Sequence, residues 1–156
     1  MLARFFALAA TATLALASPA YADSSAHAMA ADTHGSKIIA NVGGPLAGTK
    51  PVLVRVHADW CPACKETAAT VDAVNKQYAG RVTFVQFDVT DGKTAAASEA
   101  TAKKLHLSTF YEKTKSATST VAVIDPKTGN IIAQLYDDTT IADYTKAIDK
   151  TLALKK

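Results

Sequence analysis

Residues 52–65 read VLVRVHADWCPACK and contain both cysteines of the chain, Cys61 and Cys64. Before the cysteines, the β-branched run from Pro51 to His57 predicts a buried strand. After them, a helix is expected over Pro62 to about Tyr78; it starts with a proline, whose missing N–H costs nothing in a first helical turn. Both cysteines are therefore expected at a strand-to-helix junction.

Two cysteines three positions apart favour redox chemistry over a structural role. A disulfide that closes so short a loop removes little chain entropy from the unfolded state. Structural zinc needs four ligands, and the chain has no second C-x-x-C pair. We expect Cys61 to be the nucleophile, because free backbone N–H groups at the junction favour a thiolate. Cys64, one turn later, is expected to be the resolving thiol, and Trp60 to pack beside the pair and shape access to it.

The rest of the chain alternates predicted strands and helices within one domain, residues 37–156. The early alternation of strands and helices indicates parallel pairing, and a turn at Pro126–Asn130 indicates a hairpin. The fold class expected is α/β, with a mixed, mostly parallel sheet, a C-terminal antiparallel hairpin and helices on both faces. The remaining elements are expected as strands at 81–89, 120–125 and 131–136, helices at 94–105 and 140–154, and a polar connector at 108–119.

The N-terminal residues have the pattern of an export signal. Residues 1–22 carry one positive charge, an apolar run of signal-peptide length and the closing triplet Ala20-Tyr21-Ala22. Cleavage after Ala22 would leave residues 23–36 as a flexible leader and place the protein in the periplasm or outside the cell; the alternative is an uncleaved anchor. No later stretch has the length and apolarity of a membrane span.

The overall charge and composition restrict the partners. A formal net charge of +3 is too weak to argue for nucleic-acid binding. No cofactor and no resident metal are expected, and we expect the mature chain to act as a monomer.

The cysteine segment resembles the active-site strand and helix of thioredoxins. The residues that carry the resemblance are Ala58-Asp59-Trp60-Cys61 followed by Ala63-Cys64-Lys65, which are especially similar to the C-terminal thioredoxin-like domain of DsbD-type reductases. The resemblance implies a thioredoxin-like fold. It also implies thiol–disulfide exchange with protein thiols or disulfides, and a redox partner protein.

The sequence departs from the thioredoxin pattern opposite the cysteines. Thioredoxins carry a cis-proline just before the strand that faces the active site, whereas here Ser119, next to Thr120, occupies that position. A cis bond before an ordinary residue costs about 3–4 kcal/mol, so a trans peptide is expected. In the family that proline is also thought to keep metals away from the thiols.

A second departure is Arg55, which stands on the strand where thioredoxins have a buried aspartate. Strand alternation puts Arg55 and His57 on one face and Val54 on the other. If Arg55 faces the thiols, its fixed charge should stabilise a thiolate and make the pair more oxidising. The alternative is that the guanidinium extends to solvent. His57 could act as a base or a third metal ligand, although a lone histidine on a strand is more often structural.

Three functions remain open from the sequence. The first is an exported thiol–disulfide oxidoreductase using Cys61-Pro62-Ala63-Cys64, which could reduce, oxidise or isomerise its substrates. The second is a binding or chaperone protein for Cu(I), in which the same cysteines are soft thiolate ligands. The third is a scaffold that keeps the cysteines as a passive disulfide.

Overall fold

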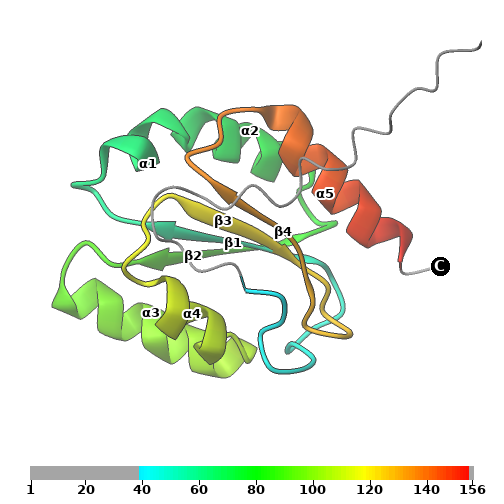
Figure 1. The fold of residues 1–156 in the computed structure, drawn as a ribbon, viewed down its shortest axis with the longest axis horizontal. Helices are drawn as coiled ribbons and strands as arrows, with labels where there is room; N and C mark the ends of the chain where they lie inside the picture. Colours follow the sequence, from blue (N-terminus) through cyan, green and yellow to red (C-terminus); the bar gives the residue numbers. More distant parts are fainter. Residues whose placement is uncertain (1–38, 155–156) are drawn as a thin grey trace, which may run out of the picture.

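The computed structural model describes residues 39–154. The signal-peptide and leader assignments for residues 1–36 lie outside the described residues. The described chain forms a four-stranded sheet with helices on both faces (Figure 1). Its elements are β1 (Val52–His57), α1 (Pro62–Glu66), α2 (Ala68–Gln77), β2 (Thr83–Asp88), α3 (Gly92–Leu105), α4 (Ser108–Thr114), β3 (Thr120–Ile124), β4 (Ile131–Tyr136) and α5 (Ile141–Ala153).

The strand order is β2-β1-β3-β4, which makes β1 a central strand. The pairing of β1 with β2 is parallel, and the pairings of β1 with β3 and of β3 with β4 are antiparallel. The sheet is therefore mixed, as expected, and the prediction that it is mostly parallel is wrong.

The polar connector predicted at 108–119 explains that error, because part of it folds as α4. Helix α3 leads away from the end of β2, and α4 with the turn after it brings the chain back to the same end of the sheet (Figure 1). The next strand, β3, therefore enters antiparallel to β1. The inward residues of α4 are Phe110, Tyr111 and Thr114.

Strand alternation gives the sheet two apolar faces, because successive side chains of a strand point to opposite sides. Val52, Val54 and Val56 pack with Phe87 and Phe110 on the side of α3 and α4. Burial of each such side chain contributes about 1.5–3 kcal/mol to the free energy of folding. On the side of α2 and α5, the core contains Leu53, Val71, Val74, Val121, Val123, Tyr144 and Ile148.

The hairpin between β3 and β4 also anchors the first described residues. Gly129, in the turn of the hairpin, has a φ of 71°, and its carbonyl accepts a hydrogen bond from the Val42 N–H at 3.0 Å. A Cβ at Gly129 would lie 2.0 Å from the carbonyl oxygen of Gly44. The turn therefore needs glycine for both its backbone conformation and its close contact.

We predict that Gly129→Ala lowers the free energy of unfolding by about 3 kcal/mol, because strain from overpacking adds to the positive φ. The matched control is Gly80→Ala, where φ is 76° and no atom lies within 4 Å of the added Cβ. That variant should lose only about 1–2 kcal/mol. Urea denaturation measures both, and equal losses would contradict the close contact at Gly129.

Candidate functional site

Cys61 lies at the N-terminus of α1, where the strand-to-helix junction was predicted. It is the N-cap residue, in extended conformation with φ −84° and ψ 115°, and Pro62 follows in the first turn. Its Sγ accepts a hydrogen bond from the Cys64 N–H at 3.1 Å. This backbone donor is one that the helix itself leaves unpaired, so the sulfur of Cys61 is held where negative charge is favoured.

Cys64 is buried one turn later, with its Sγ 3.9 Å from the carbonyl oxygen of Val56. Burial raises the pKa of the Cys64 thiol, and so does its hydrogen bond to the Cys61 sulfur. The Ala58 N–H and the charge of Arg55 act in the opposite direction on this pKa, but the net shift is upward. Cys64 is therefore a protonated thiol at neutral pH, and both cysteines are reduced in this structure.

Arg55 lies on the same face of β1 as Leu53 and faces α1. Its side chain is 4% exposed, and its Nη2 donates to the carbonyl oxygen of Cys64 at 2.5 Å. The guanidinium is therefore buried beneath the cysteine helix and does not extend to solvent. Its Nε is buried with no hydrogen-bond partner among the described residues.

The bond from Arg55 explains why the helix predicted over residues 62–78 is interrupted. The carbonyl of Cys64 accepts from Arg55 and, at 3.4 Å, from the Thr67 hydroxyl. Helix α1 ends at Glu66 and α2 begins at Ala68. Side-chain donors thus satisfy the Cys64 carbonyl, which in an unbroken helix would accept a backbone N–H of the next turn. Hydroxyl side chains often compete with the helix backbone in this way.

Ser119, which we aligned from the sequence with the proline of the thioredoxin pattern, lies against the cysteine helix, where its hydroxyl is 3.4 Å from that of Thr67. It is buried, its φ is 68°, and its N–H donates to the Val56 carbonyl at 2.9 Å. This is the carbonyl that the Cys64 sulfur also approaches. Residues 39–154 contain no cis peptide bond.

Thr120 is also buried and closes the turn before β3. Its hydroxyl donates to the Ala117 carbonyl at 2.7 Å. A turn closed in this way fixes the backbone that leads from Ser119 into the strand. Thr120 therefore shapes the loop opposite the cysteines through its bond to Ala117, and not through a hydrogen bond to either sulfur among the described residues.

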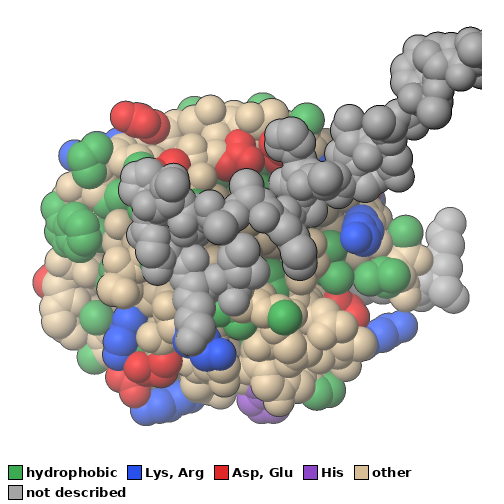
Figure 2. Space-filling view, in the orientation of Figure 1, with side chains coloured by type: hydrophobic (Ala, Val, Ile, Leu, Met, Phe, Trp, Pro, Cys, Tyr) green, Lys and Arg blue, Asp and Glu red, His purple; other side chains and the backbone are tan. Residues whose placement is uncertain are grey.

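Trp60 is the exposed part of the site. Its side chain is 61% exposed, and its indole N–H donates to the Thr90 carbonyl at 3.1 Å. The Thr90 hydroxyl in turn accepts from the Asp59 N–H at 3.0 Å. Figure 2 shows hydrophobic side chains at the end of the molecule where Figure 1 places the turn between β1 and α1.

His57 is half-buried at the end of β1. Its Nε2 lies 3.1 Å from a carboxylate oxygen of Asp59, and its Nδ1 is buried with no partner among the described residues. A role for His57 as a base or metal ligand stays a prediction. In residues 39–154, no three His, Cys, Asp or Glu side chains are grouped closely enough to hold a metal ion.

The structure thus brings together Arg55, Cys61, Cys64 and Ser119, all of which the sequence had singled out. It adds Thr67 and Thr90, which sequence reasoning missed. Neither threonine belongs to a motif that marks it in the sequence, and only the fold brings Thr67 to Ser119 and Thr90 to Trp60. No helix within residues 39–154 has the length and apolar content needed to cross a bilayer.

A sequence model of the family described as Thioredoxin matches residues 44–126, just over half of the chain. The chain therefore belongs to the thioredoxin family, and the predicted thioredoxin-like fold is confirmed.

Relatives match over shorter segments. The chain is 44% identical over 48 residues to the chloroplastic thioredoxin-like protein HCF164 of Oryza sativa subsp. japonica. The matched segment covers 31% of this chain and 18% of that protein. It is 31% identical over 48 residues to the thiol:disulfide interchange protein TxlA of Synechococcus elongatus, covering 31% of this chain and 25% of that protein. The chain thus spans a quarter or less of the length of these relatives.

A solved structure with a similar chain is the Fasciola hepatica thioredoxin. The TM-score is 0.43 at 21% sequence identity, and the match covers 66% of this chain and 82% of that one.

We predict that Ser119→Pro lowers the free energy of unfolding by about 3 kcal/mol, because proline fixes φ near −65° and removes the N–H donor to Val56. Ser119→Gly is the matched control. It keeps the N–H and tolerates the positive φ, so its stability should stay within about 1 kcal/mol of the unmodified protein. Denaturant unfolding gives both values; a proline variant as stable as the glycine variant would contradict this backbone geometry.

We also predict that Cys64 resists alkylation at neutral pH. Its raised pKa leaves it protonated, and each unit of upward shift lowers the thiolate fraction about tenfold. Brief treatment of the reduced protein with iodoacetamide at pH 7 should therefore label Cys61 and spare Cys64, and labelling of Cys64 should increase only as the pH rises above about 9. Fragment ions of the peptide 56–65 distinguish the two sites, and equal labelling at pH 7 would be inconsistent with the shift.

Proposed function

We propose that this chain is an exported thiol–disulfide oxidoreductase that exchanges disulfides with protein thiols. The observation that carries the proposal is the asymmetry of the pair. Cys61 is 4% exposed and its sulfur accepts a backbone hydrogen bond at the N-terminus of α1, whereas Cys64 is completely buried and its pKa is raised. Cys61 is therefore the attacking cysteine, and Cys64 reacts only in the second step.

In the reducing direction, the Cys61 thiolate attacks one sulfur of a substrate disulfide. The substrate S–S bond breaks, a mixed disulfide forms, and the first substrate sulfur leaves as a thiolate. Cys64 then loses its proton and attacks the Cys61 sulfur, which releases the second substrate sulfur. The Cys61–Cys64 pair is thereby oxidised to a disulfide by two electrons, and the substrate disulfide is reduced to two thiols. The same steps in reverse order oxidise a substrate dithiol.

The surroundings of the pair support this chemistry. The exposed Trp60, anchored to Thr90, gives an apolar contact for a partner protein beside Cys61. Burial of Cys64 delays its attack until the mixed disulfide forms. Export is supported by the pattern of residues 1–22, and we propose a periplasmic location and a redox partner protein that resets the pair.

The test is insulin reduction with dithiothreitol by the purified protein and two single variants. Cys61→Ser should lose nearly all of the activity, because the attacking sulfur is gone. When reduced Cys64→Ser is freed of dithiothreitol and mixed with insulin, it should instead accumulate a mixed disulfide with this substrate, visible on a non-reducing gel, because no second thiol resolves it.

Two outcomes would contradict the proposal. An unmodified protein that is inactive but binds one Cu(I) tightly would favour the metal-binding function. An unmodified protein with neither behaviour would leave the cysteines as a passive disulfide. Trapping by Cys61→Ser in place of Cys64→Ser would reverse the assigned roles.

A further inference from the structure

Arg55 is a buried cation that no carboxylate of the described residues pairs with. Its side chain is 4% exposed, and the ion pairs within residues 39–154 do not include it. Within the same residues its hydrogen-bond acceptor is the neutral carbonyl of Cys64, and its Nε has no acceptor. Moving a charge out of water without a partner is unfavourable, so a nearby group that becomes negative would be stabilised by this charge.

The groups around Arg55 identify where such a charge can form. Its neighbours across the sheet are uncharged, Gln86 on β2 and Val121 on β3. On α5, the Arg55 charge lowers the pKa of Tyr144, but burial raises that pKa by more and keeps the hydroxyl neutral. From α1, the Arg55 charge acts directly on Cys64.

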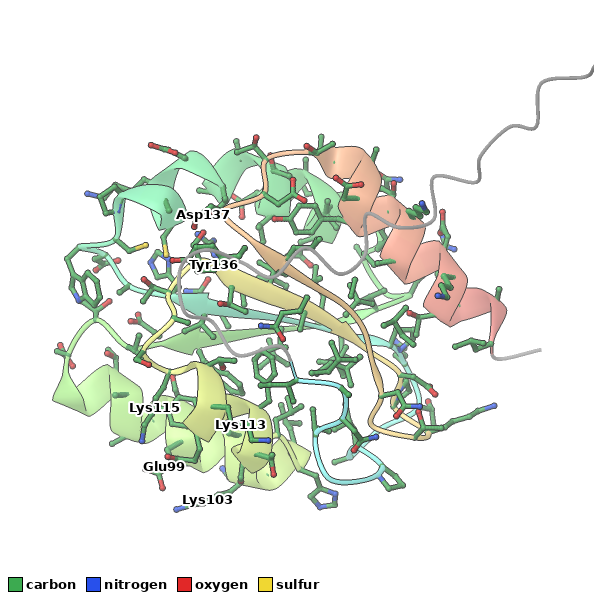
Figure 3. All side chains as sticks on the ribbon, viewed as in Figure 1. Glu99, Lys103, Lys113, Lys115, Tyr136 and Asp137 are labelled. Atoms are coloured by element: carbon green, nitrogen blue, oxygen red, sulfur yellow. The ribbon has the colours of Figure 1, made fainter. Side chains whose placement is uncertain are left out.

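Lys65 and Glu66 follow Cys64 on α1, and both are exposed to solvent. Asp137 and Asp138 follow β4 and act on Tyr144, and Figure 3 shows Asp137 at the end of the sheet. Two residues along β1, His57 contacts Asp59. The charged side chains Glu99, Lys103, Lys113 and Lys115 lie on α3 and α4, across the sheet from α1 (Figure 3).

We propose that Arg55 is a positioning residue that raises the reduction potential of the Cys61–Cys64 pair and so biases it toward oxidising substrate dithiols. The inference deepens the proposed function and rests on it. A substrate thiolate attacks the Cys61 sulfur of the disulfide, the Cys61–Cys64 bond breaks, and Cys64 leaves as a thiolate beside the guanidinium. A second substrate thiolate then forms the substrate disulfide and releases Cys61, so two electrons pass to the pair.

The stabilisation belongs to the reduced form alone. The disulfide carries no charge, whereas the reduced pair carries a thiolate over part of the pH range. Arg55 therefore lowers the free energy of the reduced pair relative to the disulfide wherever that thiolate is present. At neutral pH and below, where the Cys64 thiol is protonated, this advantage disappears.

The test is the equilibrium of the purified protein with reduced and oxidised glutathione between pH 6.5 and pH 9.5. Arg55→Met keeps the length of the side chain without its charge, and Arg55→Lys keeps the charge without the planar donors. At pH 9.5, where the Cys64 thiol begins to lose its proton, Arg55→Met should shift the equilibrium up to about tenfold toward the disulfide, the effect of a one-unit change in thiol acidity. The shift should shrink toward pH 6.5, where Cys64 is protonated with or without the Arg55 charge, and Arg55→Lys should stay close to the unmodified protein at every pH.

Comparison at each pH removes the titration of glutathione, which is common to all three measurements. A shift of equal size at every pH would mean that Arg55 acts only through its bond to the Cys64 carbonyl, and it would overturn the proposal. An unchanged equilibrium in Arg55→Met would overturn it as well. If Arg55→Met fails to fold, Arg55→Gln takes its place.

Failure of the proposed function would look different. The unmodified protein would then not cycle between dithiol and disulfide at all, or would cycle without reducing insulin. A change confined to the position and pH dependence of the glutathione equilibrium tests Arg55 alone.

Discussion

The carbonyl oxygen of Val56, near the end of the central strand β1, contacts both sides of the cysteine site. It accepts the Ser119 N–H at 2.9 Å and is approached by the Cys64 sulfur at 3.9 Å. Since β1 is paired on both sides, this carbonyl cannot move without distorting the sheet. One rigid acceptor therefore sets the separation between the cysteine helix and the loop before β3.

A second constraint on the cysteine helix is the buried side chain of Arg55, on β1. Most residues of the α2 and α5 side of the sheet are apolar, yet Arg55 is placed among them with its charge unpaired by any described carboxylate. Its bond to the Cys64 carbonyl ties the electrostatics of the pair to the shape of the helix, because the same contact coincides with the break at Thr67. The charge of Arg55 and the shape of the cysteine helix are therefore not independent. A neutral variant and a charged variant of Arg55 are both needed to separate the two effects.

The sequence predicts the parts of the fold that depend on local pattern. The strand before the cysteines, the N-cap position of Cys61 and the alternation of Arg55 with Val54 follow from β-branched runs, Pro62 and the period of a strand. The direction of β3 does not, because it depends on whether the polar stretch that contains Phe110 and Tyr111 forms a helix. The break at Thr67 also escapes local pattern, since no proline or glycine marks it and its donor, Arg55, lies on the preceding strand and reaches Cys64 only through the fold. The burial of Arg55 is likewise a tertiary property, because an arginine on a strand can either bury or extend its head group.

Trp60 is the one tryptophan of the chain, and its position has a spectroscopic consequence. Its indole is already largely in water in the folded protein and is held by a single hydrogen bond to Thr90. The intrinsic emission excited at the indole band should therefore change little when the core melts. A partner protein that covers the ring should shift this emission, so the fluorophore reports docking beside Cys61 far better than it reports unfolding.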